Sequence, residues 1–171
     1  MSERPMWAPW RIEYVTGPKS GECPFCEAAA GHHPDADLVV ARGGSCFVML
    51  NRFPYASGHL MVLPLRHIAS LLDLHPDEQT EVMRLTQLAI QALTEVMGPE
   101  GFNVGLNLGR AAGAGVDEHL HQHVVPRWAG DTNFMPVLAD VNVVPEALRA
   151  TRQRLVQAWP RPKRLIGDQP G

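Results

Sequence analysis

The sequence lacks the features that would mark a membrane-spanning or secreted protein. No apolar run comes near the roughly 20 residues that a membrane-spanning helix needs, and residues 1–11 contain no apolar core of a secretion signal. Only three cysteines are present, and a small, odd number argues against a disulfide framework. These absences predict a cytoplasmic protein with reduced thiols and no membrane partner.

An excess of positive charge is also missing. The chain carries 15 Lys and Arg against 18 Asp and Glu, which gives a formal net charge of -3. Proteins that bind nucleic acid polymers through their overall field have the opposite sign, so we expect no such partner. An anionic ligand would have to be met locally, by a few Arg side chains and backbone N–H groups, and this favours a small ligand.

The pattern of apolar residues predicts an α+β domain with an antiparallel sheet of about five strands. A long helix is expected to begin at Pro76, where a first-turn proline is tolerated, and to end at Gly98. A second helix is expected over residues 145–159. Short apolar stretches typical of strands cover residues 38–41, 46–50, 59–64, 102–108 and 119–126.

No internal repeat or low-complexity tract is present, so one domain with decorated ends is expected. Its core is predicted over residues 38–128, after an irregular, Pro- and Gly-rich extension over residues 1–37 that contains a Cys-x-x-Cys pair. A C-terminal extension with the second helix follows over residues 129–159. Residues 160–171 are expected to form a flexible tail.

Three alternating histidines, His119, His121 and His123, are the strongest chemical signal in the chain. In a strand they would share one face, and packing alone rarely uses three rings, because each buried nitrogen needs a partner. Two uses remain: a zinc site, or one imidazole that acts as a nucleophile with help from the other two. The Gly- and Ala-rich loop over residues 109–115 favours the second use, because its backbone N–H groups can approach an anion.

Residues 119–125 (HLHQHVV) resemble the pattern of the histidine triad family, three alternating histidines followed by two apolar residues. Residues 51–67 (NRFPYASGHLMVLPLRH) are similar to that family's strand-turn-strand segment. Residues 101–109 (GFNVGLNLG) and 126–134 (PRWAGDTNF) resemble a bacterial branch related to diadenosine tetraphosphate phosphorylases. The resemblance spans roughly residues 5–155 and implies a histidine triad fold that forms a homodimer.

The resemblance also implies roles for single residues. His121 would be the nucleophile that forms a covalent nucleotidyl-imidazole intermediate at the α-phosphorus, and His123 would bond a phosphate oxygen. His119 would lie behind His121 as an orienting or metal-binding group. Asn51 falls where the family binds the ribose, and His59 aligns with a further histidine of open role. The phosphates would be held by Asn107 and by the backbone of Gly113, Ala114 and Gly115.

These roles predict nucleotidyl transfer or hydrolysis at the α-phosphate of a nucleoside phosphate compound, without a catalytic metal. Diadenosine tetraphosphate is the favoured substrate, with Arg127 as a candidate contact for an acceptor phosphate and Arg110 and Arg66 as further phosphate contacts. The alternatives are a nucleoside phosphoramidase, a nucleotide-binding sensor with little turnover, and a metal hydrolase centred on the triad. Gln122 departs from the family pattern, where an apolar residue is usual, but its side chain should face away from the site.

The Cys23-x-x-Cys26 pair has three interpretations: a redox pair, two ordinary thiols, or half of a structural zinc site. A redox pair of the thioredoxin type would need a βαβ context, which is missing. The family resemblance supports zinc, which would pin the segment that carries the nucleophile. It implies the ligand set Cys23, Cys26, His67 and His119. His32 and His33 lie nearer to the cysteine pair in sequence and are the fallback ligands.

Overall fold

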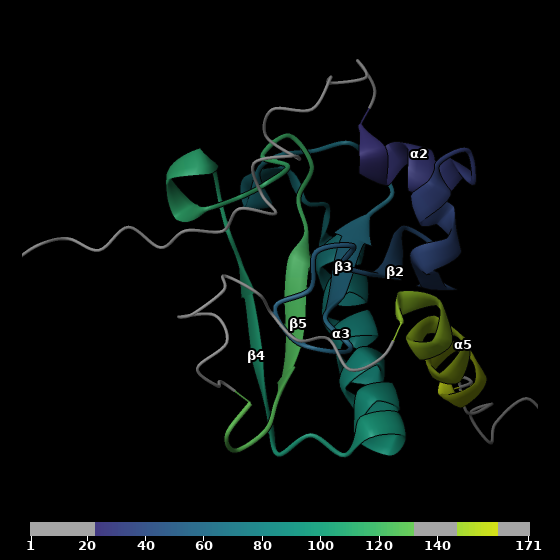
Figure 1. Cartoon of the computed structure of the whole chain (residues 1–171). Coiled ribbons are helices and arrows are strands. Elements are labelled where there is room, and N and C mark those ends of the chain that lie inside the picture. The colour runs from purple at the N-terminus through teal and green to yellow at the C-terminus, as the bar shows by residue number, and fades with distance from the viewer. Residues whose placement is uncertain (1–22, 132–146, 161–171) are drawn as a thin grey trace, which may run out of the picture.

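The computed structural model describes residues 23–131 and 147–160, which form a five-stranded antiparallel sheet with helices packed against it (Figure 1). The strand order is β1-β2-β3-β5-β4. This confirms the predicted α+β class and the antiparallel sheet. The strands are β1 (Val39–Arg42), β2 (Cys46–Leu50), β3 (Leu60–Pro64), β4 (Gly101–Leu106) and β5 (Gln122–Arg127).

The long helix α3 (Pro76–Met97) has the predicted ends. Its first turn is closed by Glu78, whose carboxylate accepts from the His75 N–H at 2.8 Å. Its last turn stops at Gly98, which takes the left-handed conformation (φ 57°) that ends many helices. The helix packs on β2, β3 and β5. Its buried face carries Leu85, Ala89, Ala92 and Leu93.

The second predicted helix is α5 (Leu148–Ala158), which packs on α3 and β1 (Figure 1). No helix among the described residues is long and apolar enough to cross a bilayer. Residues 1–22 of the N-terminal extension and residues 132–146 of the C-terminal extension lie outside the described residues. Of the predicted tail over residues 160–171, only residue 160 is described.

The N-terminal extension is more ordered than its composition suggested. It contains helix α2 (Pro24–Ala30) and the 3-10 helix η1 (Pro34–Leu38), so the prediction of irregular structure is wrong over these residues. The prolines stand at the first helical positions, and Gly31 follows α2 with φ 83°. Proline at a helix start and glycine past its end are boundary signals, not signs of disorder.

The histidine segment enters the sheet later than predicted, since β5 begins at Gln122 and leaves His119 and His121 before it. The pairing of Val62 with Gln122 would next set Leu120 opposite Pro64. Proline has no N–H to donate, and the Leu120 N–H instead bonds the Ile68 carbonyl at 2.6 Å. The ladder therefore stops, and the first two histidines lie in an irregular segment.

Gln122 points to the helix side of the sheet, as expected. Its Nε2 donates to Oγ1 of Thr86 on α3 at 2.6 Å. The strands β2 and β3 are buried along their whole length, so the histidine segment and the loops around it are attached to the rigid centre of the sheet.

Candidate active site

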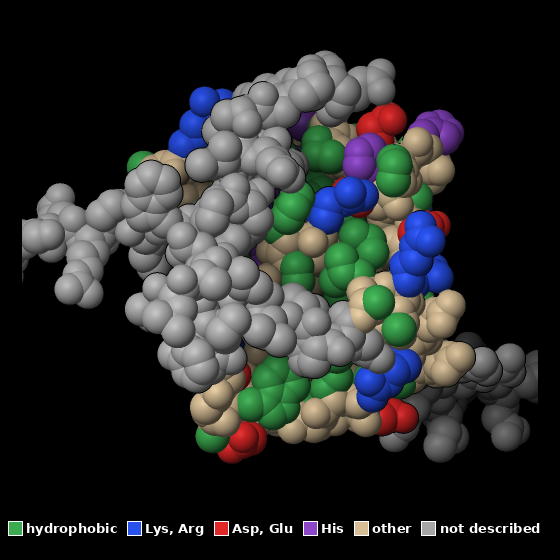
Figure 2. Space-filling view, in the orientation of Figure 1, with side chains coloured by type: hydrophobic (Ala, Val, Ile, Leu, Met, Phe, Trp, Pro, Cys, Tyr) green, Lys and Arg blue, Asp and Glu red, His purple; other side chains and the backbone are tan. Residues whose placement is uncertain are grey.

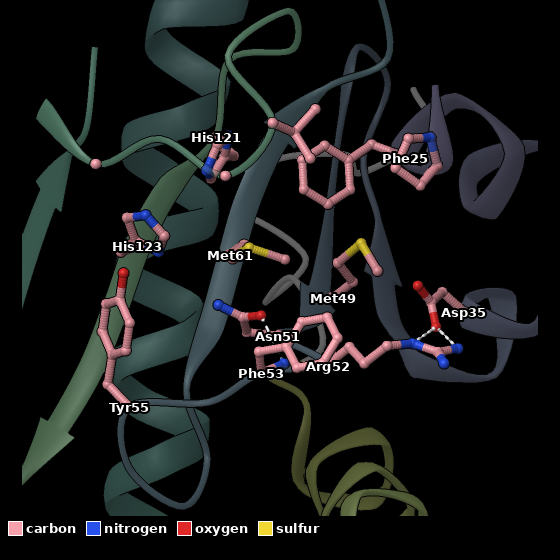
Figure 3. A pocket seen from close by; sticks show the side chains of 14 residues that line it. Phe25, Asp35, Met49, Asn51, Arg52, Phe53, Tyr55, Met61, His121 and His123 are labelled. Atoms are coloured by element: carbon pink, nitrogen blue, oxygen red, sulfur yellow. Dashed lines mark hydrogen bonds and ion pairs between the residues drawn. The ribbon is translucent and has the colours of Figure 1, made fainter. Parts of the chain in front are cut away.

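A cavity opens beside His121 and His123, at the end of β5 and against β2 and β3 (Figure 3). One wall is apolar and is formed by Phe25, Met49, Phe53, Met61 and Val116. The polar groups that line it are Asp35, Asn51, Arg52, Tyr55 and the two histidines, and the loop residues Gly113 and Gly115 also reach it. An apolar cleft with a few convergent polar groups is the usual form of a small-ligand site.

On one face of the molecule, the described basic side chains are scattered. On the face shown in Figure 2, Arg side chains lie singly among apolar and acidic ones in the part of the chain that the structure describes.

The imidazole of His121 is fixed as a nucleophile requires. Its Nδ1 lies 2.7 Å from the His119 carbonyl, so Nδ1 carries the proton and donates it to that oxygen. Burial lowers the pKa of His121, although this hydrogen bond acts in the opposite direction. The ring is therefore neutral at neutral pH, with the lone pair on Nε2, and it points into the cavity (Figure 3).

His123 is set in the complementary state by His59. The Tyr55 N–H donates to Nδ1 of His59 at 3.1 Å, so the proton of His59 is on Nε2, which lies 2.9 Å from Nδ1 of His123. Nδ1 of His123 must then accept, and its proton is on Nε2. That Nε2 lies 3.3 Å from Nδ2 of Asn107. Two N–H donors would oppose each other there, so in the tautomer set by His59 the Asn107 amide must turn its Oδ1 to this proton. His123 is thus a hydrogen-bond donor at the cavity.

His59 itself is fully buried. Burial, with His123 and His121 nearby, lowers the pKa of His59 to about 3. It therefore stays neutral across the physiological range and holds one tautomer. The linear pattern leaves the role of His59 open, because nothing in it says which nitrogen the ring presents.

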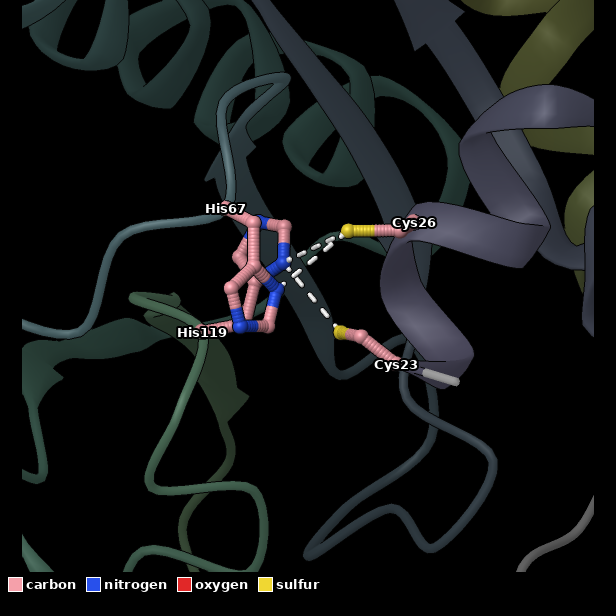
Figure 4. A group of neighbouring side chains, drawn as sticks. All are labelled: Cys23, Cys26, His67 and His119. Carbon is pink, nitrogen blue, oxygen red and sulfur yellow. Dashed lines mark hydrogen bonds between the residues drawn. The ribbon is translucent and has the colours of Figure 1, made fainter. Parts of the chain in front are cut away.

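The four cysteine and histidine residues implied by the resemblance come together at the other end of the histidine segment (Figure 4). Their ligand atoms all lie within 4.8 Å of one another. Nδ1 of His119 is 3.3 Å from Sγ of Cys23 and 3.5 Å from Sγ of Cys26, and Nδ1 of His67 is 3.4 Å from Sγ of Cys26. The fallback residues His32 and His33 are not part of this group.

This Cys/His cluster fits a tetrahedral cation. Bonds of about 2.3 Å to sulfur and 2.0–2.1 Å to nitrogen put neighbouring ligands about 3.5 Å apart, close to the distances observed. His119 donates from Nε2 to the Pro64 carbonyl at 2.9 Å, which leaves the Nδ1 lone pair directed at the sulfurs. Burial and the neighbouring Cys23 raise the pKa of Cys26 to about 11, so a cation is what would convert the Cys26 thiol to a thiolate.

Residues 35–130, more than half of the 171 residues, match the HIT domain family model. The chain belongs to the HIT domain family. The AP-4-A phosphorylase of Mycobacterium tuberculosis strain H37Rv is 42% identical over 164 residues, which cover 91% of this HIT protein and 84% of the relative. The adenosine 5'-monophosphoramidase of Schizosaccharomyces pombe is 31% identical over 105 residues, 61% of this chain and 74% of that one.

Among solved structures, a zinc-bound histidine triad family protein from Mycobacterium smegmatis superposes with a TM-score of 0.67 and 26% identity. The match covers 82% of this HIT protein and 94% of that chain. A histidine triad nucleotide-binding protein from Sulfolobus tokodaii shares the fold, with a TM-score of 0.66 at 23% identity over 80% of this chain and 91% of that one.

The glycine-rich loop of the HIT protein is placed at the cavity, but part of its donor capacity is used within the loop. The Gly113 N–H donates to the Arg110 carbonyl at 2.9 Å, and the Ala114 N–H donates to the Gly109 carbonyl at 3.3 Å. Gly113 and Gly115 line the cavity, whereas Ala114 is not among the lining residues described. Of the three predicted phosphate holders, Gly115 is the one whose N–H these two bonds leave for a ligand.

The three arginines singled out in the sequence are each held by a carboxylate away from the cavity lining. Arg127, at the end of β5, forms a bidentate pair with Asp131 at 2.6 and 2.8 Å. Arg110 pairs with Asp117 and Arg66 with Glu78. The guanidinium that lines the cavity is that of Arg52, which sequence reasoning missed although it directly follows Asn51.

Proposed function

We propose that this HIT protein transfers or hydrolyses the nucleotidyl group of a dinucleoside polyphosphate, with diadenosine tetraphosphate as the favoured substrate. The observation that carries the proposal is the state of His121, a neutral ring whose Nδ1–H is anchored on the His119 carbonyl and whose Nε2 faces the cavity. The 42% identity to a protein named AP-4-A phosphorylase supports the choice of substrate.

The reaction follows from the two tautomers. Nε2 of His121 attacks the α-phosphorus, the bond from phosphorus to the bridging oxygen breaks, and ATP leaves with that electron pair. Negative charge grows on the equatorial oxygens, where the Nε2–H of His123 can donate to one of them. An acceptor then attacks the phosphorus on the side opposite Nε2. The bond from phosphorus to Nε2 breaks, its electron pair returns to the ring, and the acceptor's proton is released to solvent. Water gives AMP, and inorganic phosphate gives ADP.

The cavity offers a place for each part of the nucleoside. Asn51 lies between the histidines and the far end of the cavity (Figure 3), where its amide can bond the ribose hydroxyls. Its Oδ1 already accepts from the Phe53 N–H at 2.9 Å, which fixes the side chain. The apolar wall with Phe25 and Met49 suits a base.

We further propose that the Cys/His cluster holds a structural zinc ion. Such an ion would supply stability, by fixing His119 and with it the carbonyl that orients His121. No step of the reaction passes through it. Cysteine ligands of this kind stay reduced in the cytoplasm, which fits the predicted location.

A homodimer is proposed from the open edge of the sheet. The strand β4 pairs with β5 on one side, and Asn103, Val104 and Gly105 are exposed on it, Val104 by 45%. Unpaired N–H and C=O groups at an edge favour pairing with a second copy about a two-fold axis. Light scattering at micromolar concentration should give about twice the mass of one chain, and the mass of a single chain would contradict the dimer.

A nucleoside phosphoramidase is the second candidate, because a relative with this name is 31% identical. Product analysis separates the two. Diadenosine tetraphosphate should yield ATP plus ADP with millimolar phosphate and ATP plus AMP without it. Cleavage of adenosine 5'-phosphoramidate together with an inert tetraphosphate would favour the phosphoramidase instead. Binding without turnover of either compound would favour a sensor.

A further inference from the structure

At the end of the cavity away from the histidines lies an ion pair that the reaction does not use. Asp35, in η1, is 8% exposed, and Arg52 follows β2. Arg52 approaches Asp35 through Nε, at 2.5 Å, and through a terminal nitrogen, and both contacts are on the same carboxylate oxygen, Oδ1 (Figure 3). Both residues line the cavity.

Among residues 23–131 and 147–160, no group donates a hydrogen bond to the second oxygen of Asp35. Nδ1 of His33 lies 3.4 Å from Oδ2, but this nitrogen accepts from the Asp35 backbone N–H at 3.0 Å. A neutral ring nitrogen that accepts has no proton to give. Oδ2 therefore has lone pairs available in a largely buried position. A buried acceptor without a donor destabilises the protein, so a ligand that donates a hydrogen bond to Oδ2 gains binding free energy.

The order of groups along the cavity decides which part of a nucleotide reaches Oδ2. Figure 3 shows His121 at one end, Asn51 in between and Asp35 at the opposite end, with Met49 between Asn51 and Asp35 on the apolar side. A nucleotide with its phosphorus at His121 and its ribose at Asn51 directs the edge of its base toward Asp35.

We propose that Asp35 reads the base, by accepting a hydrogen bond on Oδ2 from the exocyclic amine of adenine. Arg52 orients the carboxylate by occupying Oδ1. A base with a carbonyl at the same position would bring two acceptors together and be rejected. This inference rests on the proposed function, since it assumes that a nucleotide lies with its phosphate at the histidines.

The test compares the binding of three ligands to the full chain by calorimetry: AMP, IMP, and purine riboside 5'-monophosphate. The last has hydrogen in place of the amine, so it removes the donor without adding bulk. We expect both analogues to bind roughly 10- to 100-fold more weakly than AMP, as for the loss of one hydrogen bond to a buried charged group. This comparison uses only the wild-type protein, so a folding defect of a variant cannot affect it.

Two variants sharpen the test. Asp35→Asn should bring AMP and IMP to within about threefold of each other, because an amide can donate to a carbonyl. Asp37→Asn is the matched control and should keep the wild-type ratio, since Asp37 is exposed and pairs with Arg149 on the surface. Each variant is checked by its melting temperature.

Equal binding of the three ligands by the wild-type chain would overturn the inference and leave the nucleotide site intact. A wild-type ratio in folded Asp35→Asn would also overturn it. Failure of all three ligands to bind would instead remove the proposed function, and with it the basis for a base-reading residue.

Discussion

His119 and His121 lie two residues apart in one irregular segment, yet they face different chemistry. His119 donates from Nε2 to the Pro64 carbonyl and turns Nδ1 to two sulfurs. His121 donates from Nδ1 to the His119 carbonyl and turns Nε2 to the cavity. In each ring one nitrogen is fixed by a backbone oxygen, and this decides which lone pair is presented. The histidine pattern alone does not separate a ligand from a nucleophile; the partner of the other nitrogen does.

The largest effect should follow from removing the nucleophile. His121→Ala is expected to abolish turnover of diadenosine tetraphosphate and to leave nucleotide binding within about tenfold, because only bond making is lost. His32→Ala, at an exposed position, is the control and should behave as the wild type. An acid-labile adenylyl group trapped on His121 would support the mechanism directly. Substantial activity in the alanine variant would place the nucleophile elsewhere.

A smaller loss should follow from breaking the contact that sets His123. His123→Ala removes one transition-state donor and should lower kcat by about 10²–10³. His59→Phe removes the Nε2–H that bonds His123 at 2.9 Å, so the His123 tautomer is no longer fixed and kcat should fall by a similar factor with little change in KM.

If His59 acts through His123, the double variant with His59→Phe and His123→Ala should have the same kcat as His123→Ala alone. His59 is then a positioning residue. If the fold decreases in kcat of the two single variants multiply in the double variant, His59 acts through another route, such as packing of the loop at Tyr55.

Loss of the metal from the Cys/His cluster, which contains His119, should affect stability more than chemistry. The wild-type protein should contain about one zinc per chain, and Cys26→Ser should lose the metal and lower the melting temperature, while the rate per folded molecule falls less. Cys46→Ser is the control: Cys46 is fully buried in the core and outside the cluster, so it should keep the metal even where it destabilises. Metal-free protein grown with zinc supplied would leave the cysteines as ordinary thiols.

The sequence predicted these two sites unevenly, for physical reasons. The helix limits at Pro76 and Gly98 are local signals, and the structure shows them where the spacing implied. The histidines and the cysteine pair are local signals too, but His119 and His121 lie before β5 and not in a strand as predicted. Asp35 and Arg52 come from separate segments and meet only through packing, and no spacing joins them. The late start of β5 depends on Pro64, which lies in the neighbouring strand β3. The apolar pattern of residues 119–126 alone does not contain this information.

Hydrogen-bond direction was the part least accessible from sequence. The N–H groups of Gly113 and Ala114 were expected to face a phosphate, but in the structure they close the loop on Arg110 and Gly109. A glycine-rich composition permits close approach of a backbone to an anion. Which amides point outward depends on the turn that the loop adopts.

The smallest expected effect is a dependence of stability on pH that separates the buried ring His59 from exposed ones. The pKa of His59 is about 3 in the folded state, lowered by burial from 6.5. Above pH 6.5 both states are neutral at this group and it contributes no pH dependence. As pH falls below that value, the unfolded chain binds a proton that the folded chain refuses, so the free energy of unfolding decreases by roughly 1.4 kcal/mol per pH unit.

Urea unfolding at pH 7.5, 6 and 5 measures this slope, with roughly one proton of difference expected from His59 below its unfolded pKa. His59→Phe should be less steep than the wild type by that amount, whatever its absolute stability. Because His59 lies outside the Cys/His cluster, the difference between the wild type and this variant is free of metal release. Identical slopes for wild type and His59→Phe would mean that His59 takes up a proton in the folded state, and the tautomer argument for His123 would fail with it.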